Sequence, residues 1–220
     1  MNYTQLSNAI QAYTENTEAN FVANVPVFVT QAEQRIYNSM QFPSIRKNVT
    51  GLVSPSTPYL GCPLDFLAVY SMAVIDGTGA YEYLLNKDVN FIRQAYPIPS
   101  DTGLPRYYAL FGPQSSNADE LTFILGPTPD TSYTVELHYF YYPQSITTAP
   151  DGQTWLGDNF DSVLLYGSLV EAYTYMKGEQ DMMATYNQKY MEALALAKRL
   201  ADGMERQDAY RSGQFRQKVT

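Results

Sequence analysis

The distribution of proline and of helical periodicity divides this sequence into three parts. Eleven of the 13 prolines lie within residues 46–150, whereas both flanking parts carry apolar residues at helical spacing. Because proline removes a backbone donor and interrupts helices, the middle part is expected to form short strands and turns. The segregated order predicts an α+β fold: a helical bundle formed by the N- and C-terminal helices with an inserted β-rich lobe.

The N-terminal part, residues 1–45, is expected to supply two helices of the bundle. The first covers residues 3–13, and the second covers about 25–40, with Asn24 as its N-cap and Pro26 in its first turn. Each helix has one apolar stripe and therefore needs a partner to bury it.

The middle part, residues 46–150, is expected to form the β-rich insert. Strands are predicted at 46–53, 66–75, 106–111, 121–125 and 133–142, the last three as a β-meander. Asp88 is expected to cap a short helix that extends to Tyr96. In the last strand, alternation predicts a core face formed by Tyr133, Val135, Leu137, Tyr139 and Tyr141.

The C-terminal part, residues 151–203, is expected to complete the bundle with two more helices. One runs from Asp158 or Asn159 to about Lys177 and stops at Gly178, and the other covers about 180–202 and stops at Gly203. Residues 204–220 are predicted to be an extended basic tail.

Charge is distributed unevenly along the chain, whose net charge is −8. Residues 198–220 hold six basic and three acidic residues, a net charge of +3, so the preceding 197 residues carry −11. An acidic body is unfavourable for nucleic-acid binding, which depends on neutralising phosphates. A basic tail favours an acidic partner.

Residues that could carry chemistry are few, and no catalytic, metal-binding or cofactor-binding motif is found. The single histidine, His138, lies on the polar side of a strand, and the single cysteine, Cys62, is expected to be inert. The Gly77-Thr78-Gly79 segment is interpreted as a turn rather than a nucleotide loop. Asp158 and Asp161 have the character of a glycosidase pair, but helix capping explains Asp158 better. We expect no enzymatic activity and no cofactor.

No membrane segment or secretory signal is expected. The sequence lacks a continuous apolar run of transmembrane length, and the N-terminal MNYTQLSNAI lacks basic and apolar signal regions. The 20 tyrosines suit surfaces that are buried only on assembly. Two alternatives remain open: a cell-wall hydrolase component that uses an Asp/Glu pair, and a carbohydrate- or receptor-binding module that uses Phe140 and Tyr142.

Several segments together resemble a known family of phage proteins. They are FVANVPVFVTQAEQRIYNSMQFPSIRKNVTG, YLGCPLDFLAVYSMAV, GLPRYYALFG, LTFILGPTPDTSYTVELHYFYYPQSI and the C-terminal stretch that begins WLGDNFDSVLLYGSLVEAYTYMKGEQ. In their order of strands, turns and helices they resemble the tail adaptor, or head-to-tail connector, proteins of short-tailed bacteriophages.

The resemblance implies a structural virion protein of the tail, assembled in the host cytoplasm. Such adaptors form a homo-oligomeric ring, usually of twelve copies, between the portal protein and the tail nozzle protein, and DNA passes through the channel without specific binding. The C-terminal segment of the family docks into the portal. In this sequence, the candidate docking residues are Tyr210, Arg211, Phe215, Arg216 and Lys218.

Overall fold

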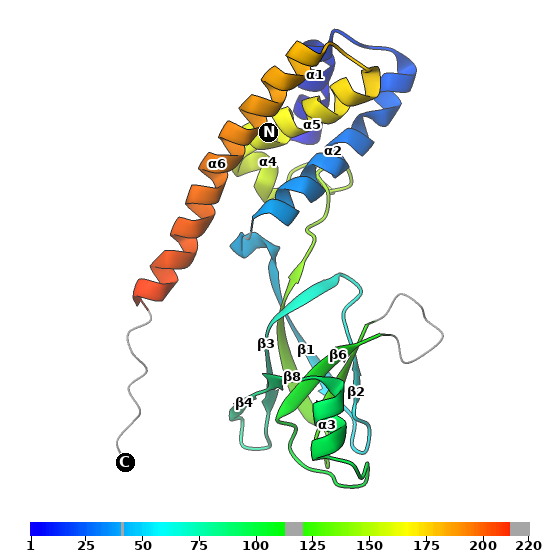
Figure 1. The fold of residues 1–220 in the computed structure, drawn as a ribbon, viewed down its shortest axis with the longest axis vertical. Helices are drawn as coiled ribbons and strands as arrows, with labels where there is room; N and C mark the ends of the chain where they lie inside the picture. The colour runs from blue at the N-terminus through cyan, green and yellow to red at the C-terminus, as the bar shows by residue number, and fades with distance from the viewer. Residues whose placement is uncertain (41, 113–120, 212–220) are drawn as a thin grey trace. The chain divides into compact units, whose positions relative to one another are not determined.

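The computed structural model describes residues 1–40, 42–112 and 121–211, except for the side chains of residues 43, 202 and 204–211. This described part contains six α-helices and two four-stranded sheets, so the fold is α+β as predicted (Figure 1). The chain forms two compact units. One is Met1–Ile45 together with the chain from Pro143 onward, and the other is Arg46–Tyr142.

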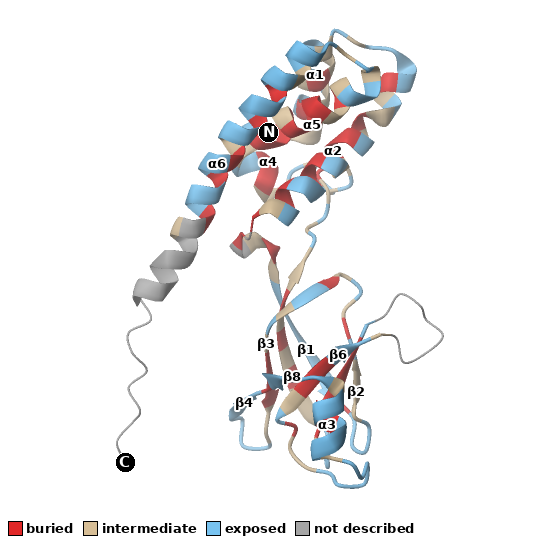
Figure 2. Cartoon of the chain, viewed as in Figure 1, coloured by how far each residue is buried: buried red, intermediate tan, exposed pale blue. Residues whose placement is uncertain are grey.

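The helical unit is arranged around one central helix. Its elements are α1 (Tyr3–Thr14), α2 (Ala19–Ser39), the 3₁₀ turn η1 (Pro43–Ile45), α4 (Trp155–Asn159), α5 (Asp161–Met176) and α6 (Gln180–Arg211). Helix α5 contacts α1, α2, α4 and α6. Leu164, Leu169 and Ala172 of α5 are fully buried by these neighbours (Figure 2).

Helix α2 begins six residues earlier than predicted, and Pro26 lies inside it rather than in its first turn. Asn24 is not an N-cap: its Nδ2 donates to the Asn20 carbonyl within the helix, at 2.7 Å. An interior proline costs about 3 kcal/mol. Phe21 and Val25 are buried, and each such side chain contributes about 1.5–3 kcal/mol, which offsets that cost.

Helix α5 ends before Gly178, as predicted. Glycine is needed there because the Tyr173 side chain lies close to it, and the left-handed residue is Lys177 instead. Lys177 takes the left-handed conformation, with φ 55°, and the Gly178 N–H donates to the Tyr173 carbonyl at 3.0 Å. A Cβ at Gly178 would lie 2.6 Å from Tyr173 Cδ1. Glycine is therefore the residue that fits at this position.

The predicted stop at Gly203 is wrong, because α6 continues to Arg211. Residues 204–211 are helical rather than extended. Glycine inside a helix costs only about 1 kcal/mol, and the neighbouring Ala, Met, Glu, Arg and Gln residues favour helix. Nothing at Gly203 forces the left-handed conformation that would end the helix.

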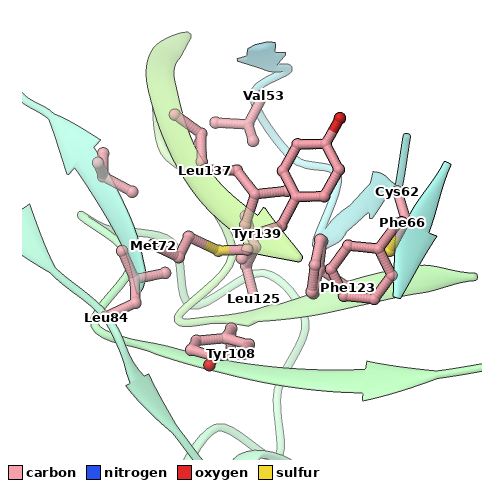
Figure 3. Close-up of a cluster of buried hydrophobic side chains, with 12 residues drawn as sticks. Val53, Cys62, Phe66, Met72, Leu84, Tyr108, Phe123, Leu125, Leu137 and Tyr139 are labelled. Atoms are coloured by element: carbon pink, nitrogen blue, oxygen red, sulfur yellow. The ribbon is translucent and has the colours of Figure 1, made fainter. Parts of the chain in front are cut away.

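The β unit consists of two packed sheets. One has the order β1 (Arg46–Val53), β8 (Tyr133–Tyr141), β3 (Phe66–Ile75), β4 (Tyr81–Tyr83), all antiparallel. The other has the order β2 (Tyr59–Gly61), β7 (Thr122–Gly126), β6 (Tyr107–Phe111), β5 (Leu85–Asn86). The buried cluster between them includes Phe66, Phe123, Leu125, Leu137 and Tyr139 (Figure 3).

The predicted core face of the last strand is confirmed. Of the predicted meander, the antiparallel pairing of β6 with β7 is confirmed, but the pairing of β7 with the last strand is wrong. Val135, Leu137 and Tyr139 are buried in the cluster, and Tyr133 and Tyr141 pack against it. Strand β8, however, pairs with β1 and β3 rather than with β7, whose second edge is taken by β2. Alternation fixes which face of a strand is buried, but it leaves the neighbouring strand undetermined.

A short helix, α3 (Val89–Ala95), covers the outer side of the second sheet. Asp88 caps it as predicted, accepting from the Asn90 N–H at 2.7 Å. Ile92 packs against Ala109 and Ile124. Both faces of β7 are thereby covered, which explains why all five of its residues are buried.

Candidate interaction surfaces

The residues considered for catalysis or metal binding are not brought together. Among the described residues, no three His, Cys, Asp or Glu side chains form a group that could hold a metal ion. His138 lies beside Ser71 on the neighbouring strand, with 3.3 Å between Nδ1 and the serine Oγ. Cys62 is buried, and burial raises the pKa of its thiol to about 12, which keeps it protonated and unreactive.

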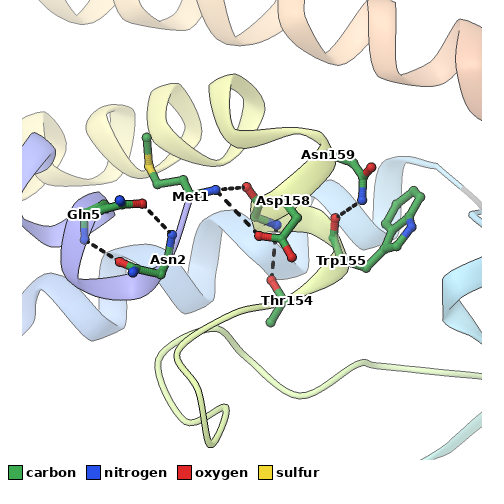
Figure 4. Close-up of polar contacts among 8 residues, drawn as sticks. Met1, Asn2, Gln5, Thr154, Trp155, Asp158 and Asn159 are labelled. Atoms are coloured by element: carbon green, nitrogen blue, oxygen red, sulfur yellow. Dashed lines mark hydrogen bonds and ion pairs between the residues drawn. The ribbon is translucent and has the colours of Figure 1, made fainter.

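The carboxylate of Asp158 has a structural partner rather than a second carboxylate. Its Oδ1 lies 3.7 Å from the amino group of Met1, which also donates to the Gly157 carbonyl at 2.7 Å (Figure 4). The predicted capping role of Asp158 is wrong. Thr154 caps α4 by accepting from the Gly157 N–H, and α5 begins at Asp161 without a side-chain cap.

The outer face of the first sheet carries aromatic and polar side chains side by side. At one end of β8, the Phe140 ring packs against Tyr70, with 5.9 Å between ring centroids, and the Arg46 guanidinium lies over both rings. Farther along, Asn48 donates to Glu136 at 2.8 Å. This face therefore presents ordered polar and aromatic groups that suit contact with another protein.

The two end strands of the same sheet expose apolar side chains. On β1, seven of the eight residues are not buried, and Leu52 is 73% exposed. On β4, all three residues are exposed, with Tyr81 at 51% and Tyr83 at 66%. The sequence analysis missed this surface, because the residues of a strand do not indicate whether the strand lies at the end of its sheet.

A polar network anchors the start of β1 to the loop before β3. Lys47 Nζ lies 2.7 Å from one oxygen of Asp65, and the Tyr139 hydroxyl donates to the other at 2.8 Å. Partial burial raises the pKa of Asp65, but these two hydrogen bonds, the positive charge of Lys47 and a backbone hydrogen bond together outweigh it and leave the pKa below its ordinary value. The hydrogen bond to Asp65 raises the pKa of Lys47.

Helix α6 offers another exposed apolar surface. Tyr186, Tyr190, Leu194 and Ala197 face inward, whereas Met191, Leu196 and Leu200 are more than half exposed. Of the candidate docking residues, Tyr210 and Arg211 occupy the last turn of this helix, and their side chains are not described. Phe215, Arg216 and Lys218 lie outside the described residues.

Comparison with known protein families decides what kind of protein carries these surfaces. Residues 1–217 match the family model described as SU10 adaptor protein. The chain belongs to the SU10 adaptor family. No curated protein matches it significantly.

Membership of the SU10 adaptor family gives the protein a structural role in a bacteriophage, as a component of the virion that contacts other head or tail proteins. The sequence-based resemblance to phage adaptors is thereby confirmed. None of the helices in the described ranges is long and apolar enough to cross a membrane. For an adaptor, the exposed sheet ends and the exposed side of α6 are candidate contact surfaces.

Proposed function

We propose that this chain is a tail adaptor that joins the portal ring of the phage head to the tail nozzle and lines part of the DNA channel. The observation that carries the proposal is the match to the SU10 adaptor family over residues 1–217. The proposed assembly is a homo-oligomeric ring, of twelve copies if it follows a twelve-subunit portal.

The charge distribution supports this role. The first 197 residues carry a net charge of −11, and a negatively charged channel wall lets DNA slide without adhering. The C-terminal 23 residues carry +3 and end a helix that exposes Met191, Leu196 and Leu200 among polar side chains. We propose that this end, including Tyr210, Arg211, Phe215, Arg216 and Lys218, docks on an acidic surface of the portal.

The two other functions left open by the sequence have less support. The Asp158 carboxylate is close to the amino group of Met1, so it is not a free partner for Asp161 in glycoside hydrolysis. Phe140 already packs against Tyr70 and Arg46, which occupies the ring face that a sugar would need.

Sedimentation with portal rings of the same virus tests the proposal. We expect the chain to comigrate with the portal at about one copy per portal subunit. A variant that lacks residues 212–220 keeps α6 to Arg211, so it should still fold into the same helical and β units while its portal affinity falls. A matched control replaces Arg211, Arg216 and Lys218 with glutamine, which separates charge from chain length. Independent sedimentation of chain and portal under all conditions would refute the adaptor role.

A further inference from the structure

The eight-residue strand β1 forms one end of its sheet. Its residues pair with β8 from Arg46↔Phe140 to Val53↔Tyr133, and no other described strand pairs with its second edge. The other end strands of the two sheets, β2, β4 and β5, have only two or three residues each, so β1 is the longest end strand described. A long exposed strand with free N–H and C=O groups is a template for another strand.

Among the described residues of the β unit, an open groove lies beside β1. The groove has a volume of about 270 Å³ and is lined mainly by apolar groups of β1, β2 and β8, including Val49, Leu60 and Leu137. The space beside Gly51 and Gly61 is open: a Cβ atom at either position would have no neighbouring atom within 4 Å. A strand added along β1 would cover this groove and remove its apolar lining from water.

The opposite end of the same sheet is β4, and it runs in the direction needed to meet β1. The four strands are antiparallel to their neighbours, so β1 and β4 run in opposite directions. If a second copy continues the sheet in the same orientation, its β1 lies antiparallel to β4 of the first. Antiparallel strands make the better-aligned hydrogen bonds.

Side-chain faces and charges of the two strands are complementary. Tyr81 and Tyr83 stand on the outer face of β4, opposite Ile75 and Ala73, and the even-numbered residues of β1, Leu52 among them, stand on the same outer face. Lys47 of β1 already pairs with Asp65 in its own chain, whereas Arg46 at the start of β1 and Glu82 of β4 carry opposite charges.

We infer that copies of this chain join head to tail by strand addition, with β4 of one copy pairing with β1 of the next. The occupant of the exposed β1 edge is thus a second copy of the same chain. The inference rests on the proposed ring function, because a closed ring needs two different surfaces on every copy, and these are the two ends of one sheet. Tyrosine rings of β4 then cover Leu52 and neighbouring side chains of β1.

Disulfide trapping tests the pairing in the full-length chain carrying Cys62→Ala. Tyr81→Cys or Tyr83→Cys is combined with Asn48→Cys, Thr50→Cys or Leu52→Cys, so that both thiols lie on the outer face. We expect at least one combination to give, on mild oxidation, a ladder of dimers, trimers and higher species that collapses on reduction. The matched control combines Tyr83→Cys with Val49→Cys, which places the two thiols on opposite faces, and it should stay at background.

Two results would overturn the inference. Dimers from a single β1 cysteine variant would show β1 pairing with β1 around a two-fold axis, and double variants at the control level would show no pairing of these edges. The same samples are sedimented with portal rings. Comigration without a ladder rejects only the strand pairing, whereas a chain that stays monomeric and unbound rejects the adaptor function as well.

Discussion

Glu33 is a buried carboxyl group on α2, and its Oε1 accepts a hydrogen bond from the Ile146 N–H at 2.9 Å. This contact ties the segment that follows Pro143 to α2 within the helical unit. Burial raises the pKa of Glu33 from its ordinary 4.5, and the hydrogen bonds from Ile146 and Ser145 only partly oppose that effect. The position needs an acceptor, but it does not need a charge.

The Glu33→Gln variant should therefore match the native protein in stability at acid pH. At a pH above the folded pKa of Glu33, the variant should be more stable than the native protein. Since the folded pKa is raised, the stability linked to Glu33 is complete below pH 4.5 and is lost as pH rises through the folded value. Each unit of pKa elevation corresponds to about 1.4 kcal/mol. Urea unfolding of both proteins between pH 4 and pH 8 measures the difference.

The control for this prediction is Glu33→Ala, which removes the acceptor. It leaves the Ile146 N–H without its partner, and its cost relative to Glu33→Gln should be about 1–3 kcal/mol at every pH, because neither variant titrates at this position. If the native protein and Glu33→Gln kept a constant stability difference across the pH range, Glu33 would not have a raised pKa.

At the scale of whole elements, the sequence predicted local structure better than it predicted connections. Asp88 and the buried face of β8 could be predicted because capping and alternation act over a few residues. The helix boundaries predicted at Pro26 and Gly203 are wrong. Burial of apolar side chains outweighs the cost of Pro26 within α2, and neighbouring residues that favour helix outweigh the cost of Gly203 within α6.

Two glycine-to-alanine replacements should have opposite effects, although both lie within helices. Gly203→Ala in α6 meets nothing within 4 Å of its Cβ and should stabilise the helix by about 0.5–1 kcal/mol. Gly157→Ala in α4 would place its Cβ 2.7 Å from the Met1 carbonyl oxygen and 2.8 Å from Ile146 Cδ1. Such crowding should cost about 1–3 kcal/mol.

Thermal unfolding followed by circular dichroism compares these two variants with the native protein. The expected order of melting temperature is Gly203→Ala first, the native protein second and Gly157→Ala last. If both replacements changed the melting temperature equally, the space around each glycine would not determine the effect of adding a methyl group. A lower melting temperature for Gly203→Ala would argue that α6 does not continue past this residue.

At the scale of the whole molecule, composition and periodicity predicted the α+β class but could not identify the contact surfaces. The exposed β1 edge depends on which strands pair, and pairing brings together residues as far apart as Arg46 and Phe140. Tyrosine content indicated that assembly surfaces exist, whereas their location required the sheet order. Leu52, Tyr81 and Tyr83 become a surface only when β1 and β4 are known to be sheet ends.

The charge separation leads to a prediction about DNA. An acidic body should not bind duplex DNA at physiological salt, because affinity for DNA comes mainly from releasing counterions of neutralised phosphates. We expect no change in fluorescence anisotropy of a labelled duplex with the full chain at tens of micromolar. A peptide of residues 198–220, with its net charge of +3, should bind weakly at low salt and lose that binding as salt is added.

The peptide separates two accounts of a positive result. If the full chain bound DNA as tightly as the peptide does, the acidic body would not be weakening DNA binding by the basic end, and the expectation of a non-adhering chain would be contradicted. If the full chain bound more tightly than the peptide, the −11 body would itself present a local basic site, and a non-adhering channel wall would have to be abandoned. Absence of binding by the full chain, with weak salt-sensitive binding by the peptide, is the result that a DNA-conducting adaptor requires.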